Sequence, residues 1–217
     1  MAKAPDTRCR LCLLTPRAYE PGPFAARLAD ALSGGDVASL IITAPANEPI
    51  TLQAAAELFV PVAAARGVAS LIHNDTRIAG RAKADGVHID SGFDDIAGAM
   101  ESLRGQKIVG AGGLGSRHEA LEAGELEPDY LFFGRLHGDT ADAIFPRALE
   151  LAEWWSSVTI VPAMVMGGQA LASVAEAASN GIAFVALSDA VWNDPRGAGA
   201  AVAEVAERLA TIREATA

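Results

Sequence analysis

Cysteine is scarce in this chain, with only two in 217 residues, and aromatic residues make up 6% of the sequence. Cys9 and Cys12 have the C-x-x-C spacing of some redox and zinc sites, but no second Cys or His pair follows at metal-binding spacing. Both lie in an expected strand, where residues three apart face opposite sides. We therefore expect two inert thiols in a reducing cytoplasm, not a disulfide or a metal site.

Positive charge is also scarce, because 17 Lys and Arg face 27 Asp and Glu and give a formal net charge of -10. Such a surface repels nucleic acid and anionic lipid, so neither is expected as a partner. A phosphorylated substrate would be repelled too, unless a metal ion or local basic groups intervene. No apolar run is long enough to span a bilayer, and Met1 to Thr7 shows no secretory signal, so we expect a cytoplasmic protein without membrane contact.

Strand-like and helix-like segments alternate along the whole chain, which predicts a single-domain (β/α)₈ TIM barrel over residues 1–217. An open doubly wound sheet is the alternative, but no G-x-G-x-x-G follows the first strand. The Gly-rich segment 110–115 comes close to that motif, yet it follows the fifth strand and is interpreted as a turn. The expected strands are Leu11–Thr15, Val37–Thr43, Val68–Ile72, Val87–Ile89, Lys107–Gly110, Asp129–Phe133, Val158–Met166 and Ile182–Leu187. The expected helices are Pro23–Leu32, Leu52–Ala65, Thr76–Ala84, Phe93–Leu103, Ser116–Ala123, Pro146–Ser156, Ala170–Ser179 and Pro195–Thr211.

In such a barrel the loops after the strands form the site, and those after the last two strands often bind phosphate. Here these loops contain Gly167, Gly168 and Ser188. Paired glycines let backbone N–H groups approach phosphate oxygens, although a tight turn between strand and helix would also require them. Asp189 must point away from a phosphate bound there, because two negative charges repel.

Acidic residues gather after the third and fourth strands: Asp75, Asp90, Asp94 and Asp95. Two carboxylates from neighbouring strand ends, helped by water and substrate phosphate, are a common way to hold Mg²⁺. Each of these residues could equally cap or solvate a helix, and Asp75 has the position of an N-cap for the helix that begins at Thr76.

A histidine and an arginine follow the sixth strand. If the chain stays extended there, Arg135 and His137 share a face and place a cation and a titratable group at the barrel mouth. His88 is expected to be a packed strand residue and His118 a surface residue. Trp154 and Trp155 cannot both face the core, so one is expected to cover the outside of the barrel or to form a contact in a homo-oligomer.

Several short motifs resemble the thiamine phosphate synthase family and its thiazole tautomerase relatives. They occur in the family's order: Ile72-His73-Asn74-Asp75, Ala84-Asp85-Gly86-Val87-His88-Ile89, Ile108-Val109-Gly110, Asp129-Tyr130-Leu131-Phe132-Phe133-Gly134, Met166-Gly167-Gly168 and Ser188. The resemblance implies a (β/α)₈ barrel whose synthase joins a pyrimidine pyrophosphate to a thiazole phosphate and releases pyrophosphate with Mg²⁺. It also implies specific roles: Asn74 at the pyrophosphate, Asp75 with Asp94 or Asp95 at the metal, and Gly167, Gly168 and Ser188 at the thiazole phosphate.

The chain departs from the family pattern at three anion-binding places. The second strand normally ends in Gln-x-Arg-x-Lys, but segment 41–46 holds no cation. The family Ser after the fifth strand is replaced around Gly112, and the later Thr-x-x-Lys survives only as Thr140, with Ala143 in place of Lys. Each lost charge-assisted contact forfeits about 1.5–3 kcal/mol. Arg135, Arg77 or Arg147 could compensate for the missing cations, although none of them is at a family position.

Three functions are therefore carried forward. The first is a synthase-like transferase acting on a small phosphorylated heterocycle. The second is a tautomerase-like isomerase with His137 as acid and base and no metal. The thiazole tautomerases carry a His at the position of Arg135 in this chain. The third is a barrel that binds a phosphorylated metabolite without catalysis.

Overall fold

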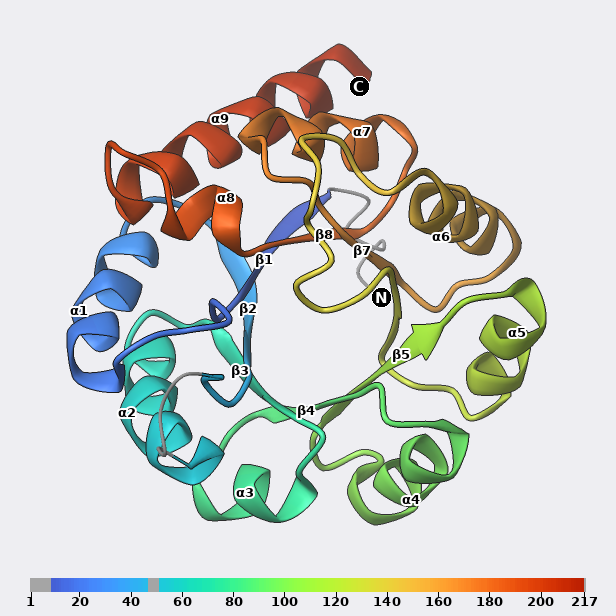
Figure 1. Cartoon of the computed structure of the whole chain (residues 1–217). Coiled ribbons are helices and arrows are strands. Elements are labelled where there is room, and N and C mark those ends of the chain that lie inside the picture. Colours follow the sequence, from blue (N-terminus) through green and yellow to red (C-terminus); the bar gives the residue numbers. More distant parts are fainter. Residues whose placement is uncertain (1–8, 47–50, 217) are drawn as a thin grey trace, which may run out of the picture.

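A computed structural model describes residues 9–46 and 51–216, with the side chains of residues 215 and 216 left out. Each of its eight parallel strands pairs with the next, and β8 pairs with β1, so the sheet closes into a barrel (Figure 1). The predicted TIM barrel is confirmed. The strands are β1 (Arg10–Leu14), β2 (Val37–Ile42), β3 (Ala69–His73), β4 (Gly86–Ile89), β5 (Ile108–Leu114), β6 (Tyr130–Phe133), β7 (Ala163–Met166) and β8 (Phe184–Leu187).

The helices surround the strands as an outer ring (Figure 1). Their first turns follow local sequence signals: Thr51, Asp75 and Ser116 are N-caps whose side chains accept a backbone N–H, and prolines lie in the first turns of α1 and α6. The helices are α1 (Pro21–Ala31), α2 (Leu52–Ala64), α3 (Thr76–Arg81), α4 (Phe93–Leu103), α5 (Arg117–Glu125), α6 (Pro146–Val158), the 3₁₀ helix η1 (Leu171–Ser173), α7 (Val174–Ser179), α8 (Asp189–Trp192) and α9 (Ala198–Thr216).

Side-chain alternation along the strands creates two apolar layers. Leu11 and Leu13 face outward into the layer between sheet and helices, whereas Cys12 and Leu14 face the barrel interior. Cys9 packs against the outer layer, so the prediction that the two cysteines face opposite sides is confirmed. Burial raises the pKa of Cys9 to about 12 and that of Cys12 to about 11, which keeps both thiols protonated and poorly nucleophilic.

The sequence prediction was wrong about the glycine-rich segment. β5 continues to Leu114, so most of segment 110–115 is strand and not a turn. The reason lies inside the barrel, because a Cβ on Gly110 would lie 2.0 Å from the Tyr130 ring and one on Gly112 would lie 2.9 Å from His88 Nε2. These glycines make room for two large interior side chains.

Smaller corrections concern the last third of the chain. β7 begins at Ala163, five residues later than predicted; the helix after it is divided into η1 and α7; and the short α8 was missed.

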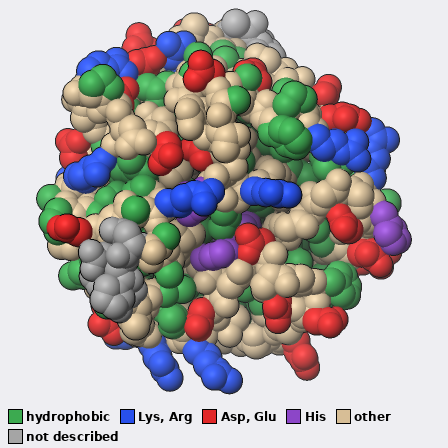
Figure 2. Space-filling view, in the orientation of Figure 1, with side chains coloured by type: hydrophobic (Ala, Val, Ile, Leu, Met, Phe, Trp, Pro, Cys, Tyr) green, Lys and Arg blue, Asp and Glu red, His purple; other side chains and the backbone are tan. Residues whose placement is uncertain are grey.

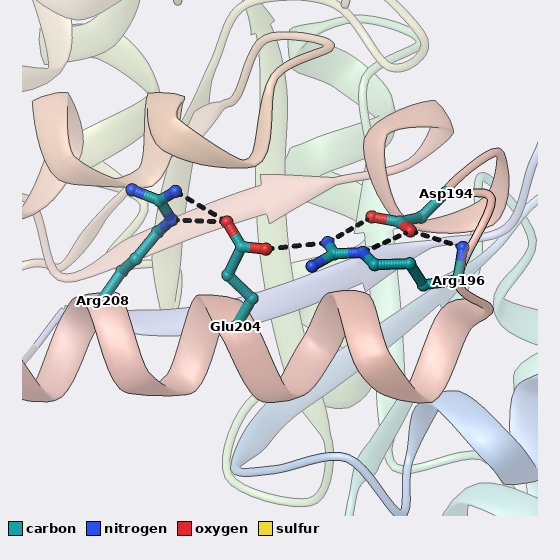
Figure 3. A network of polar contacts seen from close by, with 4 residues as sticks. All are labelled: Asp194, Arg196, Glu204 and Arg208. Carbon is teal, nitrogen blue, oxygen red and sulfur yellow. Dashed lines mark hydrogen bonds and ion pairs between the residues drawn. The ribbon is translucent and has the colours of Figure 1, made fainter.

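Arg196 pairs with Asp194 and Glu204, and Glu204 pairs with Arg208, so this ion-pair network fixes the segment after α8 to α9 (Figure 3). No helix in the described part of the chain is long and apolar enough to cross a membrane.

Candidate active site at the carboxyl ends of the strands

The ends of β3 and β4 carry a closely bonded set of three polar side chains. His73 Nε2 and Asn74 Nδ2 each lie 2.7 Å from Asp90 Oδ1, and the Asp90 N–H donates to Asn74 Oδ1 at 2.9 Å. Asn74 adopts a left-handed backbone conformation with φ 53°, which these bonds hold in place. The predicted pyrophosphate residue Asn74 is therefore rigidly oriented at the barrel mouth, with Asp90 as its partner.

Asp90 is the electrostatic centre of this set. Burial by itself raises the pKa of its carboxyl, but the hydrogen bonds from His73 and Asn74 and the nearby histidine charge outweigh burial and lower the pKa from 3.8 to about 2. The sequence left Asp90 open as part of a magnesium-binding group of acidic residues or as a residue that caps or solvates a helix. The cap is excluded, because Gly92 is the N-cap of α4 and Asp90 points to His73 and Asn74.

Below this set, aromatic rings continue into the barrel. The His73 ring stacks on His88 with centroids 6.2 Å apart, and His88 stacks on Tyr130 at 5.8 Å. His88 is fully buried and its Nδ1 lies 2.9 Å from Tyr130 Oη, which confirms the prediction of a packed strand residue. Burial lowers the pKa of His88 to about 3, so this imidazole is neutral. Gly112 lies beside the His88 ring, and a side chain at this position would collide with that ring.

The predicted metal residues Asp75 and Asp94 lie at the first turns of two neighbouring helices. Asp75 is the N-cap of α3 and accepts the Ile78 N–H on Oδ1 at 2.7 Å, as the capping interpretation predicted. Asp94 is exposed in the first turn of α4. Among the described residues no three His, Cys, Asp or Glu side chains cluster closely enough to form a metal cage. Two carboxylate oxygens suit Mg²⁺ chemically, provided that water or substrate oxygens complete the coordination.

The loop after β6 crosses the ends of β7 and β8, and we call residues 134–145 the β6 strap (Figure 1). His137 Nε2 lies 2.8 Å from Thr15 O, beyond β8 in the loop after β1. The Asp139 carboxylate accepts the Asp189 N–H at 3.1 Å, and Ile144 is buried in the outer core. The β6 strap is thus attached to the loops that follow β1 and β8.

The β6 strap also packs against the loop after β7, which the sequence predicted to bind phosphate. Gln169 N donates to Ala141 O at 2.7 Å and Ala170 N donates to Asp142 O at 3.3 Å. A Cβ on Gly168 would lie 2.0 Å from Asp142 O, so this glycine is required by the close approach of the strap.

The backbone amides that the sequence predicted to bind phosphate already have partners inside the chain. Gly167 N donates to Ala186 O at 2.8 Å, and Gly168 N donates to Ser173 Oγ at 3.0 Å. Ser188 is fully buried with its Oγ 3.5 Å from Thr15 O. A phosphate would have to replace some of these contacts in order to bind Gly167, Gly168 and Ser188.

His137 and Arg135 both lie in the β6 strap, but the chain is not extended between them. His137 has φ 56°, and Gly138 N donates to Arg135 O at 2.8 Å, so a tight turn replaces the shared face that extended backbone would give. Burial lowers the pKa of His137. Because Thr15 O can only accept, Nε2 carries the proton of the neutral ring and Nδ1 is the basic atom. Thr140 lies further along the strap and is exposed.

Three contributors to the mouth were not found by sequence reasoning: Arg17, Asp139 and the pairing of His73 with Asp90. Arg17 donates to His137 O although 120 residues separate them, and no local pattern reports such a contact. Basic and histidine side chains gather over the middle of this end of the barrel (Figure 2).

Away from the mouth, His118 is on the helix surface as predicted. Trp155 is buried, whereas Trp154 is only partly buried and lies beneath the Arg117 guanidinium.

Comparison with known proteins gives a consistent result. The family described as Thiamine monophosphate synthase matches residues 11–191. The thiamine-phosphate synthase of Rhodospirillum centenum is 33% identical, with 91% of this chain and 96% of that protein covered, and that of Hyphomonas neptunium is 36% identical, with 91% and 92% covered. The structure of thiamine phosphate pyrophosphorylase from Pyrococcus furiosus superposes with a TM-score of 0.75 at 23% identity, covering 94% of this chain and 96% of that one. This last similarity concerns the fold alone.

Proposed function

Because the chain belongs to the thiamine monophosphate synthase family, we propose that it is a transferase that joins a pyrimidine pyrophosphate to a thiazole phosphate and releases pyrophosphate. The observation that carries the proposal is the set formed by His73, Asn74 and Asp90, which orients polar groups at the strand ends of the family barrel. A cytoplasmic setting belongs to the same proposal, supported by two free thiols, of which Cys9 is partly buried and Cys12 is buried.

The chain's own residues would act mainly by positioning. Bond cleavage in the pyrimidine substrate leaves a carbocation, so the protein must orient the partners and stabilise charge more than supply a base. Asp90 holds Asn74 in a fixed orientation, and we assign Asn74 to the pyrophosphate; the stacked rings of His73 and His88 lie next to this set. Asp75 and Asp94 would hold Mg²⁺, which neutralises charge on the departing pyrophosphate when it is bound.

The acceptor phosphate is assigned to Gly167, Gly168 and Ser188, with Gly112 and Thr140 as further contacts on the neighbouring loops. This assignment requires phosphate to replace the partners of Gly167 N and Gly168 N, and the β6 strap to shift where it lies close to Gly168. Exchange of the neutral bonds of Gly167 N and Gly168 N for charge-assisted ones to phosphate favours binding, since charge-assisted hydrogen bonds are about twice as strong.

Formation of thiamine phosphate in the presence of Mg²⁺ tests the proposal directly. The informative variant is Asp75→Asn, because Asn caps a helix about as well as Asp and so removes the charge without removing the cap. Ser116→Ala is the control for a weakened helix cap, since it removes the N-cap of α5 without touching a predicted metal residue. We expect wild-type activity, a loss of at least about tenfold in Asp75→Asn and little change in Ser116→Ala. If wild type forms no product, the synthase proposal is wrong; full activity in Asp75→Asn would remove the metal assignment.

The geometry of His137 keeps a second function open. Its neutral ring has Nδ1 available as a base at the mouth, next to the exposed Arg135, as an isomerase of the tautomerase type would need. His137→Ala should then abolish isomerisation of a thiazole phosphate carboxylate. Equal turnover by wild type and His137→Ala would eliminate this alternative.

A further inference from the structure

The segment that lacks the family's cations lies directly against the loop after β1. Ala46 N donates to Arg17 O at 2.8 Å, so Arg17 is a neighbour of segment 41–46 although 24 residues or more separate them in sequence. Two buried contacts fix this loop on the end of β2: Thr15 Oγ1 lies 2.9 Å from Thr43 Oγ1, and Tyr19 Oη donates to Thr43 O at 2.5 Å. Arg17 therefore extends from a rigid backbone at the place where the cation is missing.

The side chain of Arg17 reaches from this loop to the β6 strap. Its Nη2 donates to His137 O at 2.9 Å, and the residue is exposed. Arg135 is also exposed and is joined to the same turn through the bond from Gly138 N to Arg135 O. The Arg17 guanidinium thus bonds to this turn, and Arg135 is an exposed residue within it. Figure 2 shows basic side chains together over the middle of this end of the barrel.

In the described part of the chain, Arg17 has no acidic partner, unlike several arginines on the outer surface. Arg104 pairs with Glu127, Arg147 with Glu150 and Arg208 with Glu204. Within the described residues, the contact of the Arg17 side chain is with a neutral carbonyl, which leaves its charge uncompensated. In a protein with a net charge of -10, an uncompensated guanidinium at the mouth attracts anions.

We propose that Arg17, assisted by Arg135, binds the pyrophosphate group of the substrate and so replaces the cations that the end of the second strand lacks. The guanidinium forks match phosphate oxygens in a bidentate way, so each adds charge and orientation. This proposal rests on the proposed function, since it names residues that hold the leaving group of that reaction.

Binding of inorganic pyrophosphate with Mg²⁺, measured by isothermal titration calorimetry, tests the proposal. Arg17→Gln is the informative variant, because Gln retains a donor for His137 O but has no charge. Arg104→Gln is the matched control: Arg104 also donates to a main-chain carbonyl, that of Leu126, but it follows the last turn of α4 at the other end of the barrel. We expect the dissociation constant to rise about tenfold or more in Arg17→Gln, to rise further with Arg135→Gln added, and to stay within about twofold of wild type in Arg104→Gln.

Further measurements separate a charge effect from a structural one. Arg17→Lys keeps the charge and should bind within about fivefold of wild type. Unchanged affinity in Arg17→Gln, equal losses in Arg17→Gln and Arg104→Gln, a loss in Arg17→Lys as large as in Arg17→Gln, or a wild type that does not bind pyrophosphate would each overturn the proposal. Pyrophosphate binding does not require turnover. A wild type that binds pyrophosphate through Arg17 but forms no thiamine phosphate would refute the proposed function and leave this assignment intact.

Discussion

Over the ends of β3 and β4, the side chains of His73, Asn74 and Asp90 bond to one another, and the main-chain N–H of Asp90 takes part as well. Over the ends of β7 and β8, the amides of Gly168 and Gln169 are already bonded to Ser173 and to the β6 strap. The set over β3 and β4 (the first half of the mouth) and the loops over β7 and β8 (the second half) both carry family motifs in the sequence. Their difference shows that a motif identifies which groups lie at a barrel mouth, whereas tertiary contacts decide whether those groups are available to a ligand.

The largest expected effect comes from Asp90→Ala in the first half. The change leaves the donors of His73 and Asn74 without their acceptor and releases the orientation of Asn74. We expect thiamine phosphate formation to fall by about a hundredfold or more in initial-rate assays. Glu101→Ala, an exposed acidic residue on α4, is the control and should have normal activity. If Asp90→Ala were as active as Glu101→Ala, the two halves would not differ in the way described.

Gly168→Ala should separate the β6 strap from the second half. The new Cβ would lie 2.0 Å from Asp142 O, so the strap must shift and lose its bonds to Gln169 and Ala170. We expect the free energy of unfolding in urea to fall by about 1–3 kcal/mol. Gly98→Ala in α4 meets no atom within 4 Å and should be neutral or stabilising by up to about 1 kcal/mol. Equal stability of the two variants would show that the strap is not closely packed on this loop.

Asp139→Asn should make the second half more accessible to phosphate. The Asp139 carboxylate accepts the Asp189 amide, and its charge repels an anion; Asn keeps an acceptor oxygen without the charge. We expect inorganic phosphate to bind about five- to tenfold more tightly by calorimetry. Asp142→Asn, whose side chain is exposed on the same strap, is the control for net charge. The same gain in both variants would mean that Asp139 has no special position.

The smallest expected effect is a dependence of stability on pH that belongs to the first half. The pKa of Asp90 is lowered to about 2 in the folded chain, so its contribution to stability is present above about 4 and is lost as the pH falls from there toward 2. Wild type should therefore be more stable than Asp90→Asn by about 1–2 kcal/mol at pH 5. The difference, followed by urea unfolding, should shrink as the pH is lowered to 2.5. A constant difference over that range would contradict the charge-based account of this set.

The fold could be predicted because the strand and helix periodicities are local. The bounds of Phe93–Leu103 were predicted without error, and all eight strands were placed. The extent of β5 could not be predicted, since the need for Gly110 and Gly112 arises from Tyr130 and His88, which are distant in sequence.

The site was less accessible to sequence reasoning for a similar reason. The cap formed by Asp75 was predictable from its own helix, whereas the contacts of Arg17 with Ala46 and His137 depend on barrel closure. Asp139 was overlooked because its partner, the Asp189 amide, lies 50 residues away.

A crystal structure of the wild-type protein grown with Mg²⁺ and pyrophosphate would test the central claim most directly. The account predicts pyrophosphate within hydrogen-bond distance of the Arg17 and Arg135 guanidinium groups and near Asn74, with the bond from Gln169 N to Ala141 O still present. Pyrophosphate bound instead to Gly167 and Gly168, with the β6 strap displaced and Arg17 still directed only at His137 O, would contradict it.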